Sequence, residues 1–296
     1  MAHTQSENRL PMKVDSLARE HGVASTRELH IRPRLGWIAI DWREIWESRE
    51  LLYFLILRDI KVRYKQTVLG VAWAALQPLF TMLIFTVIFG SFAKIPSEGV
   101  PYALFVFAGL LPWTFFANSV TQSSQSLVNQ QALLTKIYLP RVFVPAAPIG
   151  GGVLDLLVSG VVFGALMVFY RTAPTLSVLA LPFLILLTAA AALGVGLTLA
   201  ALTVTYRDFR YVIPFMIQSW MYVSPVIYPV SVVPKSWQWL LALNPMAGII
   251  DAFRSSLLGR PWNMEALAIS SVSALVLLVY GLFYFRKTER RFADVA

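Results

Sequence analysis

One carboxylate stands inside a part of the sequence where a charged group is costly. Asp155 lies within the apolar stretch of residues 142–170, and no lysine or arginine shares that stretch with it. An acidic side chain at membrane depth either hydrogen-bonds to a neighbouring helix or to water, or takes part in proton transfer. The sequence leaves both roles open for Asp155, and the second would be that of a proton-coupled transporter.

Most other residue patterns that carry chemistry are missing. The sequence has no cysteine, and its three histidines all lie in the polar N-terminal part, so we expect no metal site in the apolar region. It contains no Gly-x4-Gly-Lys-Ser/Thr phosphate loop, no Gly-x-Ser-x-Gly elbow and no His-Glu-x-x-His helix. Gly150-Gly-Gly152 lacks a following lysine and instead suits close helix packing. A membrane enzyme acting on glycans would need paired carboxylates, so we expect that this chain is not an enzyme.

Aromatic side chains are frequent in the apolar stretches. Packing and the interfacial belts of membrane proteins explain most of them. Aromatic faces also stack on the apolar faces of sugars, so an aromatic lining would let a glycan slide without strong binding. The candidates for such a lining are Phe80, Trp113, Phe116, Phe215, Trp220, Tyr222 and Tyr228.

Membrane helices must position these residues, because the composition does not suit a soluble fold. Of the 296 residues, 57% are hydrophobic and only 14% are charged. The apolar stretches are long enough for helices that cross a bilayer of ~30 Å, whereas membrane strands need only about 10 residues. We expect an all-α protein in which residues 67–288 form six transmembrane helices. The predicted spans are 68–92, 101–126, 142–170, 177–205, 211–230 and 266–285.

Four further segments are not predicted to span. Residues 1–40 are polar and lack the apolar core of a signal peptide, which predicts a cytoplasmic tail, and residues 289–296 form a second one. Residues 41–66 predict an amphipathic interfacial helix, with a soluble helix packed on a partner as the alternative. Residues 233–262 predict a short helical hairpin, re-entrant or on the outer side, whose second helix is capped by Gly259.

The basic residues predict the orientation. Of the 25 lysines and arginines, 20 fall on the side of the two termini when six spans are drawn. By the positive-inside rule, we expect both termini of this multi-pass protein to lie in the cytoplasm. The net charge of +9 is therefore a signal of topology and not of nucleic-acid binding.

Seven short motifs follow one another in a recognisable order over residues 40–290. They are Arg58-Asp-Ile-Lys-Val-Arg-Tyr-Lys65; Thr67-Val-Leu-Gly-Val-Ala-Trp73 with Gln77-Pro78; Gly109-Leu-Leu-Pro-Trp113 with Phe115, Phe116, Asn118 and Ser119; Leu134-Thr-Lys-Ile137; Tyr206-Arg-Asp208; Ser224-Pro-Val-Ile-Tyr228; and Asn244-Pro-Met246. With them the chain resembles the permease subunit of bacterial polysaccharide ABC exporters, the type-2 group that moves lipid-linked O-antigen, teichoic acid or capsule.

The resemblance implies a function and partners. It implies a homodimer in the inner membrane that pairs with two separate ATPase subunits, which bind ATP and Mg, and moves a lipid-linked, O-antigen-like polysaccharide through a pore at the dimer interface. Teichoic acid, capsule, a drug or a small lipid are alternative cargoes. The implied ATPase contacts are Arg58, Asp59, Lys61, Arg63, Gln130, Leu134, Lys136 and Tyr138. The implied outer gate comprises Trp237, Asn244, Pro245, Met246 and Phe253.

Overall fold

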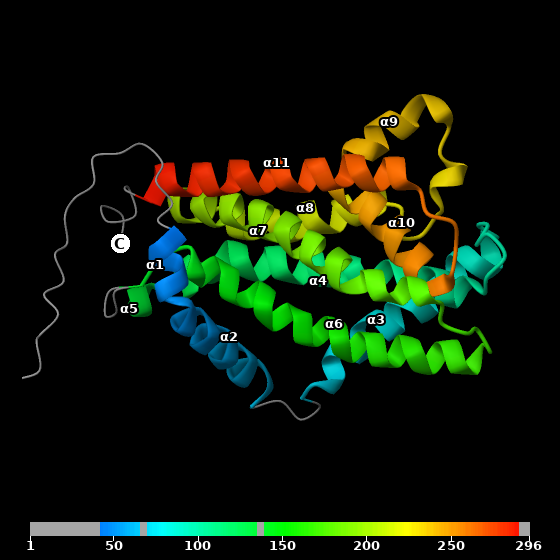
Figure 1. The fold of residues 1–296 in the computed structure, drawn as a ribbon, viewed down its shortest axis with the longest axis horizontal. Helices are drawn as coiled ribbons and strands as arrows, with labels where there is room; N and C mark the ends of the chain where they lie inside the picture. The colour runs from blue at the N-terminus through cyan, green and yellow to red at the C-terminus, as the bar shows by residue number, and fades with distance from the viewer. Residues whose placement is uncertain (1–41, 66–69, 135–138, 290–296) are drawn as a thin grey trace, which may run out of the picture. The chain divides into compact units, whose positions relative to one another are not determined.

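The computed structural model describes residues 42–65, 70–134 and 139–289, and these residues are helical almost throughout (Figure 1). No strand occurs among them, which confirms the all-α prediction. The predicted N-terminal tail and nearly all of the predicted C-terminal tail lie outside the described residues. The helices are α1 (Trp42–Glu47), α2 (Arg49–Tyr64), α3 (Ala72–Phe85) with its continuation η2 (Thr86–Phe92), α4 (Tyr102–Asn129), α5 (Gln131–Leu134), α6 (Phe143–Phe169), η3 (Leu176–Ala180), α7 (Leu181–Thr205), α8 (Phe209–Val223), η4 (Val230–Val232), α9 (Lys235–Leu243), α10 (Pro245–Leu258) and α11 (Met264–Glu289).

Five helical stretches within the described ranges are long and apolar enough to cross a membrane. They are Ala72–Phe92, Tyr102–Asn129, Phe143–Phe169, Leu176–Thr205 and Met264–Glu289. They correspond to five of the six predicted spans. Such helices satisfy their backbone groups internally, which hydrocarbon demands of any spanning segment.

The predicted span 211–230 has a different structure. Helix α8 has 15 residues, which rise about 22 Å at 1.5 Å per residue and fall short of a ~30 Å hydrocarbon layer. It ends because Ser224 precedes Pro225, whose ring disfavours helical geometry in the residue before it. Ser224 is accordingly extended, with φ −85° and ψ 145°. Six spans therefore remain a prediction.

Helix α4 forms the centre of the membrane part. It packs against α3, α6, α7, α8 and α10, and Figure 1 shows it running between α6 and α7. The side chains of Leu104, Phe105, Val106 and Phe107 are all 0% exposed. The N-terminal half of α4 is apolar and buried on all sides, so it provides the surface on which the other helices are arranged.

Two glycines allow α7 and α11 to lie in close contact. A Cβ atom added at Gly194 would lie 2.5 Å from the backbone of Leu277, and one at Gly281 would overlap the backbone of Gly194. Small residues at a crossing are the usual means of close helix packing in membranes, where no hydrophobic effect drives helices together.

Replacing Gly281 with valine should therefore separate α7 from α11. We expect a loss of about 1–3 kcal/mol, the range for overpacking a well-packed interior, seen as a lower midpoint of thermal unfolding in detergent. The matched control is Gly164→Val on α6, where an added Cβ meets no atom within 4 Å. Equal midpoints for the two variants would contradict this packing.

Candidate functional site

Helix α2 packs along α6, and a run of glycines makes the contact possible. A Cβ at Gly150 would lie 2.5 Å from the side chain of Ile56, and one at Gly152 would lie 2.9 Å from the hydroxyl of Ser119 on α4. The prediction that these glycines serve helix packing is confirmed. Leu55 is buried in this contact, while Tyr53 and Phe54 of α2 stay exposed. The helix is thus attached to the membrane helices on one side and leaves apolar surface on the other.

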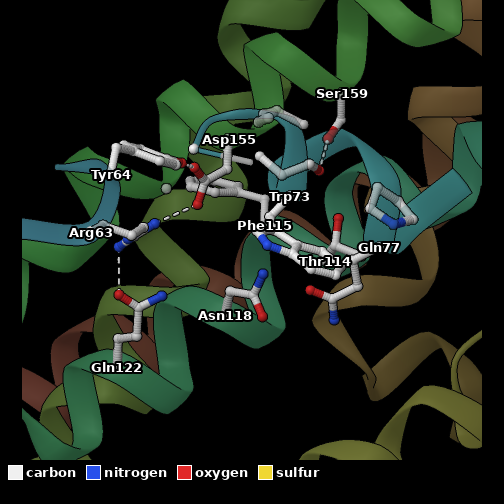
Figure 2. A pocket seen from close by; sticks show the side chains of 15 residues that line it. Arg63, Tyr64, Trp73, Gln77, Thr114, Phe115, Asn118, Gln122, Asp155 and Ser159 are labelled. Atoms are coloured by element: carbon white, nitrogen blue, oxygen red, sulfur yellow. Dashed lines mark hydrogen bonds and ion pairs between the residues drawn. The ribbon is translucent and has the colours of Figure 1, made fainter. Parts of the chain in front are cut away.

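The end of α2 places a cation beside Asp155. The Arg63 guanidinium forms an ion pair with the Asp155 carboxylate through Nη1 and donates to Oε1 of Gln122 through Nη2 (Figure 2). The Tyr64 hydroxyl donates to the other carboxylate oxygen of Asp155. The side chains of Arg63 and Asp155 are 22% and 16% exposed. Hydrogen bonding to a neighbouring helix, one of the two roles left open for Asp155, is therefore observed.

Tyr64 is protonated at neutral pH in this arrangement. Burial, together with the hydrogen bond to the Asp155 carboxylate, raises the pKa of the Tyr64 phenol to about 12. A phenol whose pKa is raised remains a hydrogen-bond donor across the physiological range. The carboxylate of Asp155 thus accepts from two donors on α2, and both lie more than 90 residues away in the sequence.

A cavity of about 350 Å³ opens next to this ion pair, between α2, α3, α4 and α6. Its polar lining includes Arg63, Asp155, Gln77 of α3 and Asn118 of α4, and Figure 2 shows them with their polar atoms around the cavity. The remaining lining residues are Tyr64, Gly70, Trp73, Ala74, Pro78, Thr114, Phe115, Gln122, Gly152, Leu156 and Ser159.

A second cavity of about 340 Å³ lies farther along α4. Arg63 and Gln122 line both cavities, and the second is otherwise lined by Asp59, Val62, Thr121, Gln125, Ser126, Asn129, Gln130 and Pro148. The Arg63–Gln122 hydrogen bond therefore lies where the two cavities meet.

The predicted ATPase-contact residues on α2 divide into two kinds. Lys61 is exposed, and Arg58 and Asp59 form a pair at 2.8 Å that remains partly accessible. Arg63 instead points into the protein, towards Asp155 and Gln122. In this conformation only the first three are available to a partner.

The other predicted ATPase contacts follow α4. Gln130 directly follows the last residue of that helix, and its side-chain Oε1 is buried with no hydrogen-bond partner among the described residues. Leu134 belongs to α5, but its side chain, together with Lys136 and Tyr138, lies outside the described residues.

One face of α8 carries a stripe of exposed aromatic residues. Tyr211, Phe215 and Tyr222 are 80%, 74% and 52% exposed. With the exposed Gln218 they follow i, i+4, i+7, i+11 spacing, which places all four within about 60° on a helical wheel. We refer to these four residues as the α8 stripe. Its spacing is visible in the sequence, although Tyr211 and Gln218 were not among the predicted lining residues.

Two of the predicted lining residues differ from this pattern because they are buried. Trp113 and Phe116 are 3% and 0% exposed within the core around α4. The structure therefore does not place them on a surface that a glycan reaches. Phe80, in contrast, is 55% exposed on α3.

Trp220 and Tyr228 have partners inside the protein. Trp220 lies on the opposite side of α8 from the stripe, with its ring centroid 5.2 Å from that of Phe116. Tyr228 is half-buried, and its hydroxyl donates to the backbone carbonyl of Val223 at 3.1 Å. Both residues therefore stabilise the end of α8 and do not form part of an open aromatic surface.

The predicted outer-gate residues lie on α9, on α10 and at Asn244 between them. Asn244 caps α10 by accepting from the backbone N–H of Met246 at 3.0 Å, and it also accepts from Trp220 Nε1 at 3.1 Å and donates to Ser224 Oγ at 2.9 Å. Pro245 follows at the first position of α10, where its missing N–H costs nothing. The cap predicted at Gly259 is confirmed, with φ +67°.

The outer-gate residues differ in exposure. Trp237 on α9 is 60% exposed, whereas Met246 and Phe253 on α10 are 0% and 2% exposed. Only α9 therefore offers large apolar side chains to the surroundings, and α10 belongs to the core.

Arg254 on α10 is a buried cation with a structural role that the sequence did not reveal. Its side chain is 0% exposed and donates to the backbone carbonyls of Phe105 at 3.2 Å and Val226 at 2.6 Å. Its guanidinium carbon lies 3.7 Å from the centroid of the Phe105 ring, a cation–π contact. Arg254 thus connects α10, α4 and the turn after α8.

A family profile and several relatives match the chain. The profile described as "ABC-2 type transporter" matches residues 50–258, from α2 to the end of α10. The O-antigen export system permease protein RfbA of Klebsiella pneumoniae is 28% identical over 247 residues, which cover 83% of this chain and 95% of that protein. RfbA of Myxococcus xanthus is 28% identical over 257 residues, 85% of this chain and 97% of that protein. The polysialic acid transport protein KpsM of Escherichia coli is 25% identical over 248 residues, 79% and 92% of the two chains.

A double-mutant cycle measures the contact between Arg63 and Asp155. Asp155→Leu alone leaves a largely buried guanidinium without its counter-ion. We expect a loss of about 2–3 kcal/mol, below the roughly 3–5 kcal/mol for a fully buried pair, because both side chains keep some contact with solvent. Arg63→Met with Asp155→Leu should recover much of that loss, because no charge is left unpaired. The measurement is thermal unfolding in detergent. Additive effects of the two substitutions would contradict a direct interaction.

Replacing Arg254 with lysine should loosen the turn after α8. A single ammonium cannot reach both carbonyls with the geometry of the guanidinium fork, so we expect a loss of about 1–3 kcal/mol and faster hydrogen exchange in residues 224–230. The control is Arg260→Lys, which can keep its ion pair with Glu98. Unchanged exchange in the Arg254 variant would show that Arg254 does not hold this turn.

Proposed function

Because the chain belongs to the ABC-2 type transporter family, we propose that it is the transmembrane subunit of an ATP-driven exporter of a lipid-linked, O-antigen-like polysaccharide. The cargo moves outward across the inner membrane through a pore between two copies of the chain. The names of the relatives, which refer to O-antigen export and to polysialic acid transport, support a polysaccharide over a drug or a small lipid. Teichoic acid and capsule remain alternative cargoes.

The main structural support for the proposal is the α8 stripe. It exposes three aromatic rings and one amide on a helix that is too short to cross the bilayer by itself. Helix α3 exposes two further apolar side chains at i, i+4 spacing, Phe80 and Ile84, which are both 55% exposed. Both helices pack on α4. Joined to the same surfaces of a second copy, they would enclose a path whose rings stack on sugars without holding any one of them tightly.

The energy comes from a separate ATPase subunit, which binds ATP and Mg. Exposed Lys61 and the Arg58–Asp59 pair give α2 a charged surface for this partner. The other contact surface is the segment after α4. Because α2 is fastened to α6 and α4 by Ile56 and Arg63, a push on α2 moves those helices as well. Prolines inside α3, α4 and α8 weaken the helical hydrogen-bond ladder and ease a change between two arrangements.

In the proposed topology both termini lie in the cytoplasm, and α9 and α10 form a gate on the outer side. Most basic residues then lie on the cytoplasmic side. Proton-coupled transport through Asp155 is the alternative from a different class. The pairing of Asp155 with Arg63 and Tyr64 favours a structural role for the carboxylate, because it already has two donors.

Export should depend on the α8 stripe. Phe215→Ala with Tyr222→Ala removes two of its rings, and we expect surface polysaccharide to fall about tenfold, the effect of losing roughly 1.4 kcal/mol of stacking at the transition state. The measurement is the amount of polysaccharide at the cell surface at equal membrane levels of the protein. The control is Leu186→Ala on α7, a residue 70% exposed outside this surface. Wild-type export by the double variant would contradict an aromatic lining.

Purification with natural partners tests the ATPase. We expect the chain to be recovered as a dimer with an ATPase subunit, and export to stop when the ATPase is inactivated. Asp155→Asn should leave ATP-driven export measurable. A stable monomer recovered without any ATPase, or export that follows the proton gradient and is abolished by Asp155→Asn, would contradict the proposal.

A further inference from the structure

Helix α4 carries a polar face that continues through both cavities. Thr114, Asn118, Gln122, Gln125 and Asn129 follow one another at intervals of three or four residues and line one cavity or the other. Fifteen residues separate the first from the last, which corresponds to about 22 Å along the helix axis. We call this surface the polar groove.

The polar groove is distinct from the α8 stripe. Phe116 contacts Trp220 of α8, and Asn118 lies two positions later, about 200° around the helix. The groove is closed by α2, α3 and α6, and none of the stripe residues lines it. A molecule in the groove therefore occupies a place inside one protomer and does not need a second copy to complete it.

Two amides in the first cavity are free to bind a ligand. Among the residues that the structure describes, no hydrogen-bond partner is recorded for the side chains of Gln77 and Asn118, although both face the cavity (Figure 2). Gln77 is exposed and Asn118 is partly buried, so both amides are accessible to a molecule that enters the cavity. A ligand with hydroxyl groups would satisfy them, because an amide both donates to and accepts from hydroxyls.

The charge of the lining argues against an ionic ligand. The positive charge of Arg63 is balanced by Asp155 in the ion pair, and Tyr64 is neutral. A phosphate would have to displace the carboxylate from Arg63. No group of three or more acidic or histidine side chains suited to a metal ion occurs in the described part of the chain. An uncharged, hydroxyl-rich ligand therefore fits best.

Aromatic and apolar groups complete the lining. Trp73 and Phe115 contribute rings, and Pro78 and Leu156 contribute apolar surface. Trp73 is also 53% exposed, so it connects the cavity with the outer surface of α3. The volume of about 350 Å³ lies within the range of about 300–1,000 Å³ that is typical of small-ligand sites. Rings beside amides are the pairing that suits sugars, whose faces are apolar and whose edges are polar.

We propose that the cavity between α2, α3, α4 and α6 binds an uncharged sugar headgroup carried on a lipid. Its hydroxyl groups are held by the amides of Gln77, Asn118 and Gln122, and its apolar face lies on Trp73. The lipid chain leaves past Trp73 into the bilayer. This site goes beyond the proposed export path, because it belongs to a single protomer and is occupied without ATP.

Cysteine protection tests this site directly, because the chain has no native cysteine. Thr114→Cys places a thiol in the cavity, and Ser236→Cys places one on the exposed surface of α9. Each full-length variant is labelled with a small thiol reagent in inner-membrane vesicles without nucleotide, and the mass shift is followed in time. The probes are octyl maltoside below its micellar concentration and an octyl phosphocholine of equal chain length.

Octyl maltoside should slow labelling of Thr114→Cys about tenfold at ten times its dissociation constant, and the phosphocholine should not. Labelling of Ser236→Cys should be unaffected by either probe. Adding Asn118→Leu should abolish the protection of Thr114→Cys. Adding Gln218→Leu, which alters the α8 stripe instead, should leave the protection intact.

Three results would overturn the site. Equal protection by both probes would show that the cavity holds only the alkyl chain. Protection by the phosphocholine alone would assign it to a charged headgroup. A thiol at position 114 that is never labelled, or is labelled equally fast with octyl maltoside, would show that no sugar enters. None of these results depends on ATP or on export, so the exporter assignment is tested separately.

Discussion

The contact between Arg63 and Asp155 joins the peripheral part of this protein to its membrane part. Each charge alone would be costly where it lies, and together with Tyr64 and Gln122 they form one set of hydrogen bonds between α2, α4 and α6. A paired and fully hydrogen-bonded charge is tolerated at low dielectric, whereas an unpaired one is not. The position of α2 is therefore fixed by these hydrogen bonds as well as by its close packing against Gly150 of α6. In the proposed exporter this is the route by which motion of the ATPase reaches the membrane helices.

Helix α4 separates two kinds of surface. Its apolar sides pack against α6, α7 and α10, and the Phe116 side supports α8 through Trp220. Its polar side lines the two cavities beside α2. Helix α8, which carries the stripe, and the polar groove thus lie on different sides of α4. An export path and a headgroup site on these surfaces would remain physically separate and yet respond to movement of the same helix.

The turn after α8 depends on the helices around it. Its residues are neither helical nor paired with strands, so their backbone groups need partners from elsewhere. Arg254 supplies donors to one carbonyl of this turn and to one of α4, and Asn244 connects Trp220 and Ser224 to the start of α10. A non-helical segment at membrane depth is stable only when protein surrounds it in this way. Movement of α10 would for that reason alter the end of α8.

The sequence by itself determined the helical class, five of the spans, the packing role of Gly150–Gly152 and the cap at Gly259, because apolar length and local backbone preference act over short distances. Pro225 also determines locally that α8 ends before Ser224. The predicted helix extended further because the apolar residues continue to position 230. Only the tertiary structure decided which aromatic residues are exposed. Trp113, Phe116 and Phe215 are all aromatic residues in apolar stretches. Trp113 and Phe116 are buried because other helices surround α4, whereas Phe215 is exposed on α8. Likewise, the partner of Asp155 lies 92 residues away, and no periodicity within one helix predicts an ion pair between two. Long-range contacts of this kind arise from the packing of the helices, and this packing brings together the residues of the candidate sites.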